Sequence, residues 1–182
     1  MATKRSSPVM HVALLRGINV GKAKRVAMAD LRSLCERLGY GEVRTLLNSG
    51  NVIFAAPRAD ANAAAKIQKE IASQIGVSCR VLVLTAAELE RIVAENPFVE
   101  CDTNPSLFQV TIFANAADRA RIVPLANQDW GAEPPGVGAP AAYLWCPNWR
   151  PERRSARPGG AALGDAAPRP TVPTAPQLTA IA

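Results

Sequence analysis

The sequence has a single histidine, and its four cysteines stand far from one another. The cysteines, Cys35, Cys79, Cys101 and Cys146, form no CxxC motif, and His11 has no cysteine or serine beside it that could complete a catalytic triad. Asp and Glu do not cluster at the spacing of metal ligands. The spacing therefore predicts no metal site and no cofactor. It indicates reduced, mostly buried thiols.

Long hydrophobic runs are also missing. The chain has no stretch of about eighteen consecutive apolar residues, so we expect no membrane span. Residues 1–8 carry charge without a long apolar segment behind them, so we expect no secretory signal peptide. Together these absences predict a cytoplasmic protein. The 182 residues, 48% hydrophobic and 20% charged, are typical of a globular chain with one ordinary domain or two small ones.

Aromatic residues make up only 5% of the chain, and positive charge exceeds negative charge by +6. Half of this excess lies in the arginine-rich segment after Trp149, so the rest of the chain is only weakly basic. The first and fourth expected strands have no aromatic residue, and Phe54 is alone on the third. An RNA-binding sheet needs an aromatic stacking platform, so these features count against nucleic acid as a partner.

Hydrophobic periodicity predicts alternating strands and helices over the first half of the chain. Short apolar runs predict strands at 12–15, 43–47, 52–54 and 80–84, and helical spacing predicts helices at 28–38 and 60–75. Asp60 is the expected N-cap of the second helix, and Gly39 and Gly76 are the expected helix ends. The order β-α-β-β-α-β is typical of a ferredoxin-like sandwich. We therefore predict an α+β fold with a ferredoxin-like subdomain at residues 9–84.

A second, incomplete ferredoxin-like α+β subdomain is expected at residues 85–148. Thr85 and Glu88 form a capping-box pattern at the start of a third helix, and 108–113 and 143–146 read as strands. The segment 149–182 is rich in Pro, Ala and Arg and has no sustained period, so we expect a disordered tail. Because such a tail supplies no helices, we expect the apolar faces around Val110, Ile112 and Leu144 to be less covered than the core of the first subdomain.

The densest polar cluster follows the first strand, between Arg16 and Arg25, and matches neither the P-loop nor the dinucleotide-binding pattern. In a β-α-β-β fold the first two strands run parallel, so this loop and the next hairpin turn emerge at one edge of the sheet. The candidate ligand-binding residues are Arg16, Asn19, Lys22, Ser49, Gly50 and Asn51. A cationic loop, a glycine turn and a helix N-terminus together suit a small anionic ligand.

Three functions remain open from the residues alone, and no catalytic residue is identified. The glycines in this cluster are also explained by turns with positive φ, and the asparagines by hydrogen bonds to the loop backbone. The first alternative to a protein that binds a small anion is a non-catalytic nucleic-acid or protein interaction module that uses the basic loop. The second is a purely structural role with no ligand.

The segments that carry a resemblance to a known family are 12–21 (VALLRGINVG) and 49–54 (SGNVIF), with Val26, Met28 and Leu31 between them. They closely resemble the bacterial family called domain of unknown function 1697, and the similarity runs from about His11 through Pro147. The resemblance implies a fold of two ferredoxin-like subdomains and implies no activity. Lys22 stands where the family usually has glycine, and the tail after Asn148 departs from the family pattern. A local frame disruption in the coding sequence is our hypothesis for that departure.

Overall fold

The computed structural model describes residues 7–19, 25–46, 50–57, 60–98, 108–113, 115–126 and 136–145. The expected disordered tail at 149–182 lies outside these residues, as do two candidate site residues, Lys22 and Ser49. The chain divides into two compact units, Met1–Leu89 and Glu90–Ala182. Each unit is built from helices and antiparallel strands, so the predicted α+β class is confirmed.

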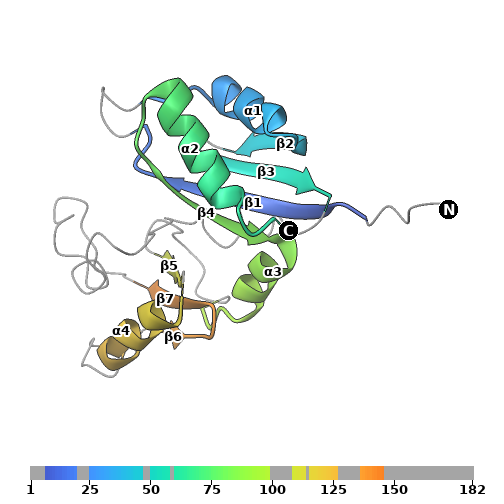
Figure 1. Ribbon diagram of the computed structural model, residues 1–182. Helices are drawn as coiled ribbons and strands as arrows, with labels where there is room; N and C mark the ends of the chain where they lie inside the picture. Colours follow the sequence, from blue (N-terminus) through green and yellow to red (C-terminus); the bar gives the residue numbers. More distant parts are fainter. Residues whose placement is uncertain are drawn as a thin grey trace. The chain divides into compact units, whose positions relative to one another are not determined.

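The first unit is a four-stranded antiparallel sheet with two helices on one face (Figure 1). Its elements are β1 (Val9–Arg16), α1 (Met28–Arg37), β2 (Gly41–Leu46), β3 (Asn51–Ala56), α2 (Ala63–Ile75) and β4 (Arg80–Thr85). The strand order is β2-β3-β1-β4, and every neighbouring pair runs antiparallel. The strands β1 and β3 are therefore central, and β2 and β4 are the edge strands.

The main core lies between this sheet and the two helices. Because side chains alternate across a strand, Ala13 and Leu15 of β1 face the helices, and Val12 and Leu14 point to the opposite face. The helices bury their predicted apolar stripes. The fully buried core residues of the helices and of the strand β3 include Leu31, Leu34, Cys35, Ala63, Ile67, Ile71, Val52 and Phe54. The helical spacing found in the sequence thus gives the correct buried faces.

The helix boundaries confirm most of the predicted caps and correct one. Gly76 ends α2 in the left-handed conformation at φ 71°, and Gly39 follows α1 at φ 87°. The capping box is formed, because the Thr85 backbone N–H donates to the Glu88 carboxylate at 2.8 Å and the Glu88 N–H donates to Thr85 Oγ1 at 3.3 Å. The prediction for Asp60 is wrong, since the N-cap of α2 is Asn62.

Asp60 instead joins three neighbouring groups just before α2. Its Oδ1 accepts from the Asn62 backbone N–H at 3.0 Å, and its Oδ2 accepts from the Tyr40 hydroxyl at 3.1 Å and from Lys66 Nζ at 2.6 Å. The Lys66 ammonium is the main cause that holds the Asp60 pKa below its usual value. The Asp60 side chain thus forms an Asx-type turn and a tertiary contact, whereas local sequence rules predict that it caps the helix.

The second unit has a smaller antiparallel sheet. After α3 (Ala86–Ala94), which crosses the boundary between the units, its elements are β5 (Phe108–Ile112), α4 (Ala116–Ala126), β6 (Gly136–Val137) and β7 (Ala141–Trp145), in sheet order β5-β7-β6. Within α4, Ile122 packs against Ala142 and Leu144. Tyr143 points to the other face, where its hydroxyl donates to the Ile92 carbonyl at 2.6 Å.

The expectation that apolar faces of this unit are less covered than the core of the first is wrong. Val110, Ile112 and Leu144 are all buried. Leu144 lies under α4, whereas Val110 and Ile112 share the face of Tyr143, which is tied to α3. The helix α4 thus covers one face of the sheet, and a hydrogen bond joins Tyr143 on the other face to α3.

Two further expectations concern the cysteines and the membrane-spanning segments. Cys35 and Cys79 are buried free thiols, as expected, and the other two cysteines lie outside the described residues. Within the described ranges, none of the helices has the length and apolarity needed to cross a membrane.

Shortening Ile71 to alanine tests the assigned core. Ile71→Ala removes a side chain that is 0% exposed, so we expect a loss of about 2–5 kcal/mol in the free energy of unfolding. The matched control is Lys69→Ala, an exposed position on the same helix, for which we expect a change within about 0.5 kcal/mol. Urea denaturation of both variants measures the difference, and equal effects would contradict the core assignment.

The buried thiol of Cys35 predicts a loss of stability at alkaline pH. Burial first, and the Glu36 carboxylate second, raise the pKa of this thiol from 9.0 to about 12. Between these values the unfolded chain ionises the thiol and the folded chain does not, so the free energy of unfolding falls as pH rises.

Cys35→Ala removes this contribution. The decline of its stability above pH 9 is expected to be shallower than in the wild type, by at most about 1.4 kcal/mol per pH unit. Tyr143, whose pKa burial raises to about 12, keeps its own contribution in both proteins. Denaturation curves at a series of pH values measure the slopes, and identical slopes would refute the assignment.

Candidate functional site

The loop after β1 and the turn before β3 meet at one end of the first sheet. Both β1 and β2 run antiparallel to β3, so they are parallel to each other, and the segments that follow them emerge at the same end. The contact between them is close: a Cβ added at Gly50 would lie 2.1 Å from Ile18 Cδ1. Gly50 also has φ +86°, which disfavours any side chain there. We call residues 16–19 and 50–51 the Arg16 end of the sheet.

Arg16 and Asn51 lie on the same face of the sheet at this end. Asn51 pairs with Leu14 across β1 and β3, and Arg16 is two residues further along, on the same side of the strand. Asn51 is only 4% exposed, whereas Arg16 is half-buried. Both side chains project from the face opposite to α1 and α2, because the core side of β1 is taken by Ala13 and Leu15.

Asn19 holds the loop rather than facing outward as a binding group. Its Oδ1 accepts a hydrogen bond from the Val26 backbone N–H at 2.8 Å, and its Nδ2 donates to the Val26 carbonyl at 3.2 Å. Asn19 itself adopts φ 54°, a conformation that asparagine tolerates better than most residues. The alternative interpretation, that this asparagine satisfies loop backbone, is therefore confirmed for Asn19.

Four of the six candidate residues are thus found at the Arg16 end: Arg16, Asn19, Gly50 and Asn51. The placements of Lys22 and Ser49 lie outside the described residues. One residue that the sequence analysis missed is Arg80, which stands directly opposite Arg16 in the pairing of β1 with β4. In the sequence, Arg80 is recognisable only as an arginine at the start of the fourth strand. Its position opposite Arg16 becomes known only from the pairing of the strands.

The segments that supply β1, β3 and β4 carry no acidic residue. Residues 1–29, 43–59 and 71–87 contain no Asp or Glu. These three segments include all of β1, β3 and β4. The helix α1, which follows the loop, begins after Ala27, which provides no side-chain cap. The strands β1, β3 and β4 therefore bring no carboxylate of their own to this end, which favours an anion over a cation.

His11 is a core residue, as the sequence favours. It is 2% exposed, its ring stacks on Phe54 with centroids 5.2 Å apart, and Nδ1 lies 2.9 Å from the Val9 carbonyl oxygen. It lies toward the start of β1, and Arg16 is the last residue of that strand. No group of three or more His, Cys, Asp or Glu side chains that could hold a metal ion occurs in the described part of the chain.

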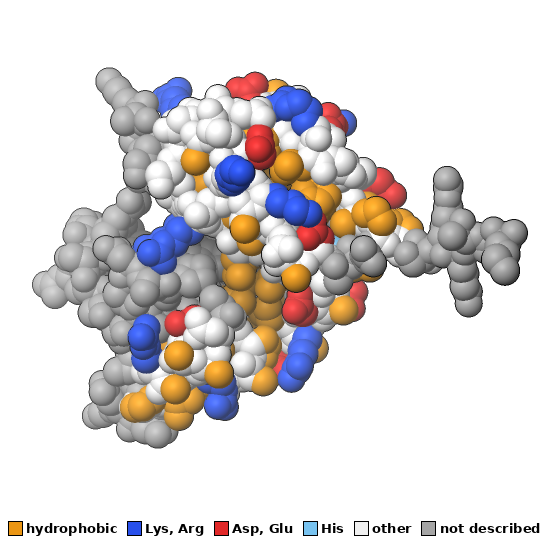
Figure 2. All heavy atoms as spheres, in the orientation of Figure 1, with side chains coloured by type: hydrophobic (Ala, Val, Ile, Leu, Met, Phe, Trp, Pro, Cys, Tyr) orange, Lys and Arg blue, Asp and Glu red, His pale blue; other side chains and the backbone are white. Residues whose placement is uncertain are grey.

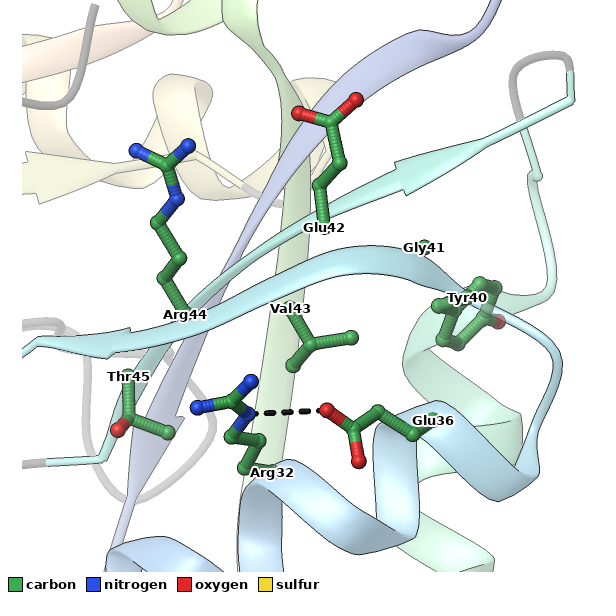
Figure 3. A pocket seen from close by; sticks show the side chains of 8 residues that line it. All are labelled: Arg32, Glu36, Tyr40, Gly41, Glu42, Val43, Arg44 and Thr45. Atoms are coloured by element: carbon green, nitrogen blue, oxygen red, sulfur yellow. Dashed lines mark hydrogen bonds and ion pairs between the residues drawn. The ribbon is translucent and has the colours of Figure 1, made fainter.

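An open groove of about 710 Å³ lies elsewhere, between α1 and the edge strand β2 (Figure 3). Arg32 and Glu36 of α1 form an ion pair at 2.9 Å, and Glu42 and Arg44 point to the other side of β2. The groove includes none of the candidate site residues. Its two arginines are matched by two glutamates, so its charge gives no preference for an anion.

Comparison with known proteins supports the family and the fold. The family model "Protein of unknown function (DUF1697)" matches residues 10–143. Among solved structures, the conserved bacterial protein SP0830 from Streptococcus pneumoniae is similar, with a TM-score of 0.64 and 21% sequence identity. The similarity covers 77% of this chain and 78% of that chain. No curated protein matches the sequence significantly.

The Ile18–Gly50 contact predicts that Gly50 tolerates no side chain. Gly50→Ala combines a left-handed backbone with a clash at 2.1 Å, so we expect a loss of more than about 2 kcal/mol in the free energy of unfolding. The matched control is Gly39→Ala, at φ +87° with nothing within 4 Å of the added Cβ. It carries the backbone penalty alone, about 1–2 kcal/mol. Equal losses in urea denaturation would show that the contact is absent.

Proposed function

As the chain belongs to the DUF1697 family of proteins of unknown function, we propose that this member binds a small anionic ligand at the Arg16 end of its first sheet. Arg16 pairs with the anion, and Asn51, with Lys22 and Ser49 of the flanking segments, contributes hydrogen bonds or charge. Asn19 and Gly50 act indirectly, by holding the loop and the turn in place. The proposal leaves open whether a reaction follows binding.

The observation that carries the proposal is the contact between Ile18 and Gly50. It fixes the loop against the turn beside Arg16 and Asn51, which the strand pairing places on one face of the sheet. A binding site needs such fixed geometry, because ordering long side chains opposes binding. The absence of carboxylates from the three segments that form this end supports an anion over a cation.

The fold assignment that accompanies this proposal is a ferredoxin-like βαββαβ sandwich in residues 9–84, followed by an incomplete second one in 85–148. The strand order β2-β3-β1-β4, with helices on one face, supports the first assignment. We also propose that the protein acts in the cytoplasm. The burial of the free thiols Cys35 and Cys79 is compatible with that compartment.

A nucleic-acid interaction module is less well supported. On the face drawn in Figure 2, Lys and Arg side chains are interspersed with Asp and Glu rather than gathered in a stripe. Binding to a phosphate backbone relies on such a stripe, and it weakens steeply with salt. Oligonucleotide binding with a steep salt slope would favour this alternative.

Anion-dependent thermal stability tests the proposal. Unfolding midpoints of the full chain are compared in chloride and in inorganic phosphate, citrate or acetate at constant ionic strength. A ligand at about a hundred times its Kd stabilises the folded state by about 2.7 kcal/mol, so the midpoint rises. We expect Arg16→Gln to abolish most of this rise.

The matched control is Arg44→Gln, which removes the same charge from another strand of the same sheet. Its midpoint is expected to rise with the anion as in the wild type. No rise with any anion in the wild type, or an equal loss of the rise in both variants, would overturn the proposal.

A further inference from the structure

The strand β2 is an edge of the first sheet. Its neighbour in the strand order is β3, so the backbone groups on its other side point away from the sheet, where a further strand can pair with them. The open groove of about 710 Å³ lies along this side, because its lining includes residues 41–45, which are five consecutive residues of β2 (Figure 3). The groove therefore follows the free edge over about 17 Å, the length of a five-residue strand.

The charged side chains around this groove are sorted by sign. Arg32 of α1 and Arg44 of β2 lie at one end of it (Figure 3). Glu36 of α1 and Glu42 of β2 lie at the other end. A copy of this surface that is turned by 180° therefore brings the negative end of one groove to the positive end of the other.

Two of these charges are available to a partner. The side chains of Glu42 and Arg44 are exposed and point to the side of β2 away from α1. In the part of the chain that the structure describes, no ion pair or side-chain hydrogen bond engages either of them. Val43, between them, turns its side chain into the core. The exposed face of this edge thus carries one negative and one positive charge, two residues apart.

We propose that this groove is an interface between two copies of the chain, in which β2 pairs antiparallel with β2 of the second copy about a two-fold axis at Val43. In that register Glu42 of each copy lies opposite Arg44 of the other, so the two exposed charges are matched twice. A two-fold interface uses the same patch on both copies and must be complementary to itself. The inference goes beyond the proposed anion binding and does not depend on it.

The charges also define the register. A two-fold axis at Arg44 would place that arginine against its own copy, and like charges directly opposite each other are destabilising. On the helix side, the same rotation about Val43 turns the Arg32 end of α1 toward the Glu36 end of the second α1. Both pairs of opposite charges, one on the strand and one on the helix, are therefore complementary about the same axis.

A bulge limits the strength of this association. The register of β2 against β3 shifts between Gly41 and Arg44, and Glu42 adopts φ 50°. Bulges at sheet edges restrict the addition of strands, so we expect a short seam and a Kd on the order of 10 µM. Well below that concentration the chain is a monomer, so the Arg44→Gln control of the anion experiment is not affected by the interface.

Sedimentation velocity of the full chain at a series of concentrations tests the proposal. The wild type is expected to change from monomer to dimer as the concentration rises. Arg44→Glu and Glu42→Arg each place like charges opposite each other twice, so each is expected to raise the dimer Kd at least about tenfold. The matched control is Lys69→Glu, which makes the same change of charge at an exposed position of α2, outside the groove, and is expected to keep the wild-type Kd.

Recombining the charges tests the register. In an equimolar mixture of Arg44→Glu with Glu42→Arg, the acidic edge of one chain faces the basic edge of the other, so heterodimers with about the wild-type Kd are expected. The double variant with both substitutions exchanges the two charges within one chain and is expected to form homodimers like the wild type.

Three results would overturn the proposal. The first is a wild-type chain that is a monomer at every concentration, which would leave the groove to another occupant such as an extended peptide. The second is a dimer that neither single variant weakens, because another surface would then join the copies. The third is a loss of association in both single variants with no recovery in the mixture or in the double variant.

Discussion

The packing of Ile18 against Gly50 is the constraint on which the candidate site depends. A glycine at position 50 leaves the space that the Ile18 side chain fills, and its positive φ lets the chain turn into β3 at the same point. The loop is closed again at Val26 by both atoms of the Asn19 amide. A short apolar contact and two hydrogen bonds thus hold the charged end of β1 in one geometry.

Much of the first unit follows from local rules. Helical spacing gives the buried stripes of α1 and α2, and the left-handed glycines Gly39 and Gly76 stand at the two helix ends where the sequence places them. The Thr85–Glu88 capping box also forms as its pattern predicts. These features depend only on residues that are close in the sequence, so they can be predicted without the tertiary structure.

The features that the sequence did not predict depend on contacts between distant parts of the chain. Asp60 looks like a helix cap, but Tyr40, twenty residues earlier in the chain, and Lys66 both bind its carboxylate. Arg80 matters only through its register with Arg16, which no local pattern shows. Leu144 is buried because Ile122 of α4, far earlier in the chain, packs against it. In each case the deciding partner is distant in sequence.

The proposed anion binds at the Arg16 end of the first sheet, where Gly17 and Gly50 hold the chain in position. The most direct measurement is ¹⁵N NMR of the full chain during titration with methyl phosphate. Binding at this end predicts saturable shifts at the backbone amides of Gly17 and Gly50 and at the Nε atom of Arg16, with Gly76 unchanged. Shifts confined to the groove between α1 and β2, or no saturable shift at all, would contradict it.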